Sequence, residues 1–218
     1  MIPAVVQSAQ YIFVQETMDT IRYIIAVMLI TAIPAAIAFW LMIHPLARFW
    51  RRVGPKMAYG VVGTATIAVM AGMVVLRSRI LAVDRGTFWP GAIAGIILLA
   101  VSGKMLRELR KQLSVRTLIG IPELTTDNDS APPITTGVYA RVRHPRYLQM
   151  TVALLGYALI ADYPAVYAAF LFWCGGIYIV MLLEERELAA RFGAAYADYC
   201  RRVPRIIPGR RFRYTATR

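Results

Sequence analysis

The residue types best suited to chemistry lie in one short basic segment, Arg143-His-Pro-Arg-Tyr147. Proline is favoured at the first position of a helix, so Pro145 predicts a helix that begins there. The free backbone N–H groups and the positive dipole at such a helix start attract an anion, and Arg143 and His144 would add side-chain donors beside it. The segment therefore predicts a site for a carboxylate or a phosphate. A basic segment at a membrane surface can also bind lipid phosphates without any chemistry.

Two adjacent carboxylates, Glu184 and Glu185, follow the last long apolar run of the chain. Acids at the C-terminal end of a helix oppose its dipole, and two carboxylates beside lipid are costly unless a cation pairs with them. Neighbouring helix residues point about 100° apart, so one of the two can face the protein interior, and we predict that Glu185 does. The next acid, Glu187, is explained by an ion pair with Arg191 one turn further on.

Together, the basic segment and the paired glutamates offer donors for a carboxylate and a carboxylate for an ammonium or a sulfonium. These are the charged groups of a ligand that carries an amino acid. Tyrosines near the two clusters could stack on a base of this ligand or shield a sulfonium through cation–π contact, although tyrosines at a membrane surface are often only interfacial anchors. The candidates are Tyr139, Tyr147, Tyr196 and Tyr199.

The elements that must position these clusters are long apolar runs. The chain has 218 residues, of which 58% are hydrophobic and 17% charged, and this balance is too apolar for a soluble domain. The runs lack the alternation of a membrane β-barrel, so we predict an all-α fold, a polytopic membrane helical bundle of about five transmembrane helices with a cytoplasmic C-terminal helix. The expected spans within this single integral membrane domain, residues 1–218, are 23–43, 57–76, 86–103, 147–161 and 163–183.

A tight helical hairpin is predicted for the last two spans, because only Asp162 separates them and Pro164 stands where a new helix would begin. This hairpin would bring Tyr147 and Glu185 to the same face of the membrane. Glycines inside the spans permit the close helix approach on which packing in lipid relies. They are Gly60, Gly63, Gly72, Gly91, Gly95, Gly175 and Gly176.

The distribution of charge predicts the orientation in the membrane. The chain has 25 lysines and arginines against 12 acids, a net charge of +13. If the five spans alternate, all but four of these cations fall on one side, and positive residues are retained in the cytoplasm. We therefore predict a multi-pass protein with its N-terminus outside and its C-terminus cytoplasmic, and we expect no nucleic-acid partner. The four exceptions are Arg22, Arg77, Arg79 and Arg85.

Several further residues continue the two clusters in a fixed order along the chain. The motifs are Gly137-Val-Tyr139, Arg143-His-Pro-Arg-Tyr-Leu148, Glu184-Glu185, Leu188, Phe192-Gly193, Tyr196, Tyr199 and Val203-Pro-Arg-Ile-Ile-Pro208. This succession resembles the isoprenylcysteine carboxyl methyltransferase and phospholipid methyltransferase superfamily, a group of integral membrane methyltransferases. One departure is Gln149, where the family often has glycine, and a side chain there would narrow the cofactor cleft or contact the substrate.

The resemblance implies an S-adenosylmethionine-dependent methyltransferase at the cytoplasmic membrane face, with its cofactor-binding part at residues 137–208. Its acceptor would be a lipid-like or small apolar molecule that reaches the site through the bilayer and carries a carboxylate, thiol or amine. The resemblance assigns no catalytic residue. The residues implied for cofactor binding are Tyr139, Arg143, His144, Pro145, Tyr147, Leu148, Glu184, Glu185, Tyr196 and Tyr199.

Two other functions fit part of the pattern. Intramembrane sterol reductases share the Arg-His-Pro-x-Tyr and terminal Tyr…Pro patterns, so an NAD(P)H-dependent sterol or isoprenoid reductase is the alternative, although the paired glutamates favour the methyltransferase. The second of these functions is that of a non-catalytic scaffold that binds anionic lipid. The two cysteines form neither a disulfide framework nor a zinc spacing, and no metal site is expected.

The sequence leaves the methyl acceptor and the oligomeric state open. We expect acceptor contacts from the N-terminal spans and from the loop at 120–137. A carboxylate or thiolate acceptor needs no strong base, whereas an amine would have to be deprotonated. The second histidine of the chain, His44, is expected to be an interfacial residue away from the site.

Overall fold

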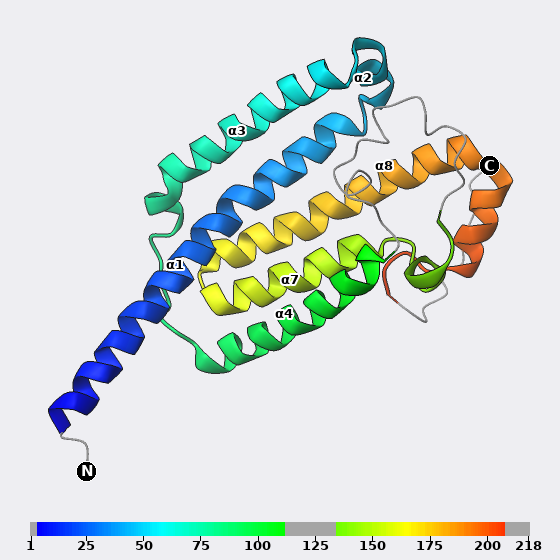
Figure 1. Cartoon of the computed structure of the whole chain (residues 1–218). Coiled ribbons are helices and arrows are strands. Elements are labelled where there is room, and N and C mark those ends of the chain that lie inside the picture. The colour runs from blue at the N-terminus through cyan, green and yellow to red at the C-terminus, as the bar shows by residue number, and fades with distance from the viewer. Residues whose placement is uncertain (1–3, 112–133, 208–218) are drawn as a thin grey trace.

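The structure is a computed structural model and describes residues 4–111 and 134–207. Within these ranges the chain forms helices joined by turns and no β-strand, which confirms the all-α prediction. The helices are α1 Ala4–Ile43, α2 Ala47–Val53, α3 Pro55–Ile80, α4 Trp89–Arg110, the 3₁₀-helix η2 Gly137–Ala140, α7 Pro145–Ala161 and α8 Pro164–Arg202. The long helices lie alongside one another, with α3 packed on α1 at one edge and α4 packed on α7 at the other (Figure 1).

Four helices are long and apolar enough to cross a membrane, namely α1 from Gln10 onward, α3, α4 and α8. A multi-pass membrane protein is thereby confirmed. The fourth predicted span, 147–161, corresponds to α7, which has 17 residues and packs against α1, α4 and α8. With this length, α7 is too short to be counted among the four helices that are long enough to cross a membrane.

The first helix is longer than its apolar run predicted. The run indicated a span at 23–43, whereas α1 begins at Ala4. Polar residues at positions 15–20 interrupt the hydropathy pattern, but no glycine or proline occurs between residues 4 and 33 to end a helix. The helix therefore continues beyond the apolar stretch, and its early side chains such as Tyr11 and Phe13 are exposed.

Glycines bring α4 and α7 into backbone contact. A Cβ atom built on Gly95 would lie 2.5 Å from the carbonyl oxygen of Gly156, and one built on Gly156 would lie 2.9 Å from that of Gly95. Close approach is thus confirmed at Gly95, and also at Gly91 and Gly176. The prediction of close approach is wrong for positions 60, 63, 72 and 175, where nothing lies within 4 Å of such an atom. Three of these four belong to α3, the helix at the edge of the bundle.

The hairpin between α7 and α8 has the predicted turn. Asp162 ends α7 in the left-handed conformation, with φ 53° and ψ 41°, and Pro164 opens α8. Behind this turn the main core packs α8 against α1, with Trp173, Ile177 and Ile37 buried. The two helices therefore run antiparallel, and their other ends meet at the opposite end of the bundle.

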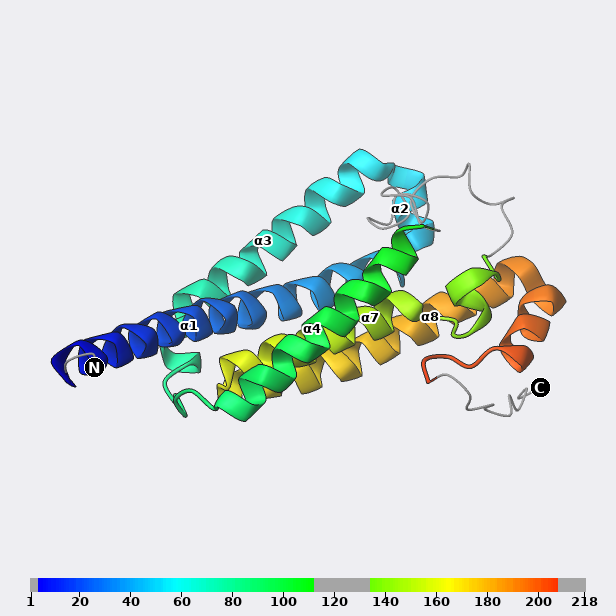
Figure 2. The same ribbon diagram turned by 60° about the horizontal axis from the view of Figure 1, so that its bottom comes forward.

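A kink in α8 turns the C-terminal residues back toward the start of α7. Gly193 has φ 51° and ψ −125°, a conformation that side chains rarely adopt, and the helix resumes beyond it to Arg202. Figure 2 shows this last part of α8 folding back beside the segment that precedes α7. The predicted C-terminal helix is therefore present, as the continuation of the last span.

Candidate functional site

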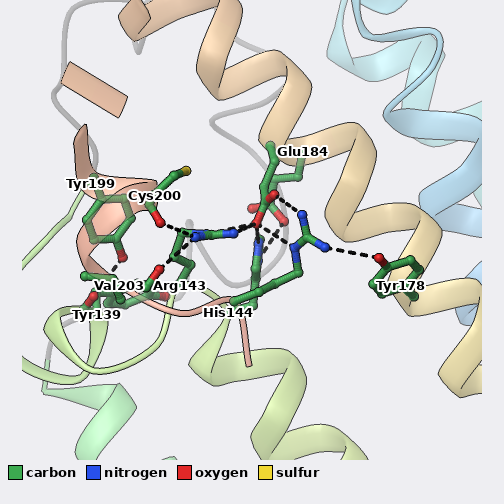
Figure 3. Close-up of polar contacts among 10 residues, drawn as sticks. Tyr139, Arg143, His144, Tyr178, Glu184, Tyr199, Cys200 and Val203 are labelled. Carbon is green, nitrogen blue, oxygen red and sulfur yellow. Dashed lines mark hydrogen bonds and ion pairs between the residues drawn. The ribbon is translucent and has the colours of Figure 1, made fainter. Parts of the chain in front are cut away.

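Three segments converge at one end of the bundle, which we call the site end. They are residues 137–148, the part of α8 from Glu184 onward, and residues 203–206 after α8 (Figure 3). Backbone hydrogen bonds join the first to the last, because the N–H of Arg143 donates to the carbonyl of Pro204 at 2.9 Å and that of His144 to Arg205 at 3.0 Å. Residues 203–206, which we call the strap, therefore hold the basic segment in place.

The basic segment has the predicted helix start. Pro145 is the first residue of α7 and is buried, and His144 is its N-cap. The backbone N–H of Leu148 donates to the carbonyl of His144 at 3.1 Å and closes the first turn. The ring of His144 stacks on that of Tyr147, with ring centres 5.6 Å apart. The helix start is thus tightly packed, with His144 directed toward α8.

The carboxylate of Glu185 is the centre of the ion pairs at the site end. It is 9% exposed, as predicted for the inward member of the pair. Its Oε1 accepts hydrogen bonds from Arg143 Nε at 3.0 Å and Arg205 Nε at 3.0 Å, and lies 3.0 Å from His144 Nε2. Its Oε2 accepts from Arg205 Nη2 at 2.6 Å. Two arginines and a histidine of this chain therefore already surround the carboxylate.

Both arginines are held by further contacts. Arg143 Nη1 donates to the carbonyls of Cys200 at 3.0 Å and Val203 at 2.7 Å, so this side chain ties α8 to the strap. Arg205 Nη1 donates to the Tyr178 hydroxyl at 3.2 Å, and its guanidinium lies over that ring. The hydrogen bond to Glu185 raises the pKa of Arg205, against the opposing effect of its own burial. This arginine remains charged at every pH at which the protein is folded.

The neighbouring carboxylate, Glu184, is held much less completely. Its Oε2 is buried and accepts no hydrogen bond from any residue that the structure describes. The Nδ1 atom of His144 lies 3.6 Å away from it. Burial raises the pKa of Tyr139 to about 12, and the charge of Glu184 adds to this rise while Arg146 opposes it. Glu184 therefore offers a negative charge beside a neutral phenol and the start of α7.

The remaining tyrosines line the same region. Tyr196 and Tyr199 are buried neighbours with ring centres 5.9 Å apart, and the hydroxyl of Tyr199 donates to the Tyr139 carbonyl at 2.7 Å. The structure thus gathers all ten residues predicted for cofactor binding at the site end, although their contact with a cofactor stays a prediction. Arg205 was missed from that set, and its place in the Val-Pro-Arg motif was the available signal.

The structure places three further polar side chains, Gln149, Glu187 and His44. Gln149 is buried between helices, where its Nε2 donates to Ser102 Oγ on α4 at 2.7 Å, so its side chain serves the α4–α7 contact. Glu187 Oε2 lies 3.9 Å from His44 Nδ1, a neighbour that local spacing did not predict. His44 consequently lies at the site end, and its expected position away from the site is wrong. The described residues contain no group of side chains that could hold a metal ion.

Comparison with known proteins supports the motif interpretation. Residues 91–195 match the model of the family described as phospholipid methyltransferase. Methanethiol S-methyltransferase 2 of Bradyrhizobium diazoefficiens is 37% identical over 75 residues, which cover 33% of this chain and 27% of that protein. Methanethiol S-methyltransferase 1 of the same organism is 33% identical over 106 residues, which cover 43% of this chain and 34% of that protein. No solved structure matches the chain.

The matched segment contains α7, the glutamate pair, Tyr139 and Tyr147, but not Tyr196 or Tyr199. The chain spans only about a third of the length of these relatives or less. The family predicted from the motifs is confirmed, and the enzyme class and cofactor follow from the family. Residues 91–195, slightly less than half of this chain, thus match the phospholipid methyltransferase family, whose members are membrane methyltransferases that use S-adenosylmethionine.

Proposed function

We propose that this protein transfers a methyl group from S-adenosylmethionine to a small apolar or lipid-like acceptor, and that a small thiol is the acceptor class. One observation carries the proposal, the buried Glu184 Oε2 that accepts no hydrogen bond from the described residues, beside the helix start of the family motif. The thiol is favoured because both relatives named above are methanethiol S-methyltransferases.

The residues present suit this cofactor. Its ammonium needs a carboxylate, and Glu184 has one that is incompletely paired, whereas Glu185 is occupied by two arginines and a histidine of the chain. We therefore assign to Glu184 the ammonium contact. The first turn of α7 and the half-buried Arg146 offer positive potential for the amino-acid carboxylate.

The cofactor supplies a methyl group on a positively charged sulfur, which a nucleophile displaces in line. The chain's own residues have to align the acceptor with that group and keep water away. The buried rings of Tyr196 and Tyr199 provide a water-poor wall, and rings of this kind also attract a sulfonium. The strap at 203–206 holds this wall against the helix start through Arg143.

The reductase alternative is disfavoured by the same contacts. A dinucleotide needs free basic side chains for its phosphates, and Arg143 and Arg205 would be the nearest suppliers. Both are bound to Glu185, and Arg143 is further used by two backbone carbonyls. Releasing them would leave a buried carboxylate without its partners, a cost of about 3–5 kcal/mol.

We also propose five crossings within one domain, residues 1–218, with the N-terminus outside and the site end cytoplasmic. With 17 residues, α7 spans about 25 Å, close to the roughly 30 Å hydrocarbon thickness. It connects the site end to the turn at Asp162, from which α8 returns as a full span, so both helices cover the same depth. Most lysines and arginines then lie on the cytoplasmic side.

The test is a methyl-transfer assay on the detergent-purified full chain with S-adenosylmethionine labelled in its methyl group. Small thiols, prenylated cysteine and phosphatidylethanolamine are offered separately, and the label is followed into volatile, small-molecule and lipid fractions. We expect transfer to the small thiol. Calorimetry with S-adenosylhomocysteine measures cofactor-site binding independently. Folded protein that neither binds this ligand nor transfers label to any acceptor would overturn the proposal. Selective stabilisation of the protein by NADPH would support the reductase.

A further inference from the structure

The second histidine of the chain lies at the site end, directly after the last residue of α1. His44 is 8% exposed, and its ring stacks on Trp40 with ring centres 5.3 Å apart. Its Nδ1 lies 3.9 Å from Glu187 Oε2 on α8. A buried imidazole oriented by a ring and an acid is well suited to accept a proton, because the acid stabilises the imidazolium that forms. His44 precedes the segment 91–195, so the family match gives it no role.

Glu187 connects this histidine to the candidate cofactor site. Glu184 and Glu187 are three residues apart on α8, so their side chains lie on the same face, with Cβ atoms about 5–6 Å apart. Each faces a histidine of another element, Glu184 facing His144 at 3.6 Å and Glu187 facing His44 at 3.9 Å. One pair belongs to the cofactor cluster, and the other stands one helical turn away against α1.

A thiol acceptor creates a need for a base that the cofactor cluster does not supply. An alkyl thiol is mostly protonated at neutral pH, and the thiolate is the nucleophile. His144 lies between two carboxylates, and Glu185 is bound by Arg143, His144 and Arg205, so both groups are engaged in holding the site together. The base has to lie beside this cluster, on the acceptor side.

We propose that His44 is the catalytic base that removes the acceptor proton, and that the acceptor therefore binds as a neutral thiol against α1, beside the His44–Glu187 pair. This inference rests on the proposed methyl transfer. The S–H bond of the acceptor breaks and its proton passes to the imidazole, while the sulfur electron pair forms the new bond to the methyl carbon. The methyl–sulfonium bond breaks, its electron pair stays on that sulfur as a neutral thioether, and the imidazolium later releases the proton to water.

The charges around His44 fit a base that is neutral before the reaction and charged after it. The carboxylate of Glu187 lies close enough to stabilise the imidazolium once it forms. Other charged residues at this end of the helices that pack on α1 are Lys56 on α3, Arg146 on α7, and Glu184, Glu185, Arg186 and Arg191 on α8. Arg52 on the adjacent α2 is exposed.

The first test compares two thiols of different acidity. With an alkyl thiol at pH 7, His44→Gln should lower kcat by about 10²–10⁴-fold, the usual contribution of a general base. With a nitro-substituted aromatic thiol, which is already ionised, the same variant should remain close to wild type. Glu108→Gln, an exposed carboxylate on α4, is the control and should leave both rates unchanged. An equal loss on both thiols would mean that His44 is structural, and no loss on either would also overturn the inference.

The second test does not depend on the variant folding. The chain has two histidines, so ¹⁵N-histidine-labelled full-length protein gives two imidazole signals, whose titration can be followed by NMR. The pKa of one must coincide with the acidic limb of kcat/KM for the alkyl thiol. In Glu187→Gln both this pKa and the kinetic limb should move down together, because the carboxylate that favours the imidazolium is gone. A kinetic limb that matches neither histidine would overturn the proposal.

A wrong assignment of the base and a wrong proposal of methyl transfer give different results. If the wild-type protein transfers methyl groups but its rates do not depend on His44, only the assignment of the base is wrong. If wild-type protein transfers no methyl group to any acceptor, the proposed function itself fails. Unchanged S-adenosylhomocysteine affinity in His44→Gln, measured by calorimetry, is expected, because His44 serves the acceptor.

Discussion

One end of the bundle buries a cation among anions, and the other buries an anion among cations. At the end opposite the site, Arg22 is 0% exposed and uses every guanidinium nitrogen. Its Nε donates to the carbonyl of Ala161 at 3.1 Å, Nη1 to Asp19 at 2.9 Å and Nη2 to Asp84 at 2.5 Å. The hydroxyl of Tyr163 donates to the second oxygen of Asp84 at 2.9 Å. We call this group the Arg22 cluster.

At the site end the charges are reversed, and one acidic side chain, Glu184, is not fully paired. Glu185 is buried among Arg143, His144 and Arg205, while the adjacent Glu184 keeps a buried oxygen with no hydrogen bond from the described residues. A polar network that is satisfied within the chain makes its surroundings rigid, whereas a buried oxygen left over carries a desolvation cost until something pairs with it. The Arg22 cluster therefore needs no ligand, and the site end gains from one.

The largest effect is expected when the central anion of the site end is removed. Glu185→Gln keeps the volume of the side chain but leaves the buried Arg143 and its neighbour Arg205 without their carboxylate, at a cost of about 3–5 kcal/mol in the free energy of unfolding. Binding of S-adenosylhomocysteine should be lost as well, since Arg143 and Arg205 would lose the carboxylate that holds both of them against α8. Denaturant unfolding in detergent and calorimetry measure the two effects. Wild-type stability would contradict the view that Glu185 organises this end.

Removing the central cation at the opposite end should separate stability from binding. Arg22→Met fills the space without charge, and the freed side chains of Asp19 and Asp84, which are 46% and 42% exposed, can rehydrate. The expected loss is therefore smaller, about 2 kcal/mol. The affinity of the folded fraction for S-adenosylhomocysteine should be unchanged. A weaker affinity would show that the two ends are coupled, and the comparison would fail.

A smaller effect is expected for Glu184, the incompletely paired acid at the site end. Glu184→Gln removes the charge proposed to meet the cofactor ammonium, so the affinity for S-adenosylhomocysteine should fall about 10- to 100-fold. Stability should change little, because no described hydrogen bond to that oxygen is lost. Glu187→Gln, one turn further along α8, is the matched control and should bind this ligand as wild type does. Equal affinity in the two variants would remove Glu184 from the cofactor site.

The comparison also explains which features the sequence predicted. Helix starts at Pro145 and Pro164 and the convergence of the two clusters follow from local rules and from the antiparallel hairpin, and the structure has them. Proline, apolar run length and turn residues act over a few neighbours, so they are readable from the chain. The inward position of Glu185 was likewise predicted from helix geometry.

Contacts that depend on tertiary structure were not predictable in this way. Arg205 reaches Glu185 only because Gly193 turns the end of α8 back, and a glycine in a motif does not reveal the sign of its φ. Packing of α8 on α1 also brings Glu187 within 3.9 Å of His44, a contact that local spacing did not predict. Arg22 was interpreted only as an exception to the charge asymmetry, because its partners at positions 84 and 161 lie far along the chain.

The smallest effect concerns the acid side of the Arg22 cluster. Burial alone would raise the pKa of Asp84, but the hydrogen bond from Arg22 and those from Gly86 and Tyr163 outweigh it, so its pKa is lowered. A carboxyl with a lowered pKa stabilises the fold above its unfolded pKa, and this contribution is lost as the pH falls through the folded value. Because the side chain of Asp84 is 42% exposed, water screens the pair, and the contribution is about 0–1 kcal/mol.

Asp84→Asn should therefore lower the melting temperature slightly at pH 7 and converge with wild type as the pH approaches 3. The measurement is thermal unfolding in detergent at several pH values, with Glu108→Gln as a control for an exposed carboxylate at the other end of the bundle. A difference that persists unchanged at low pH would mean that the shape of Asp84 matters and its charge does not. The Arg22 cluster would then stabilise the bundle by packing, and the opposition of charges between its two ends would have no energetic basis at this end.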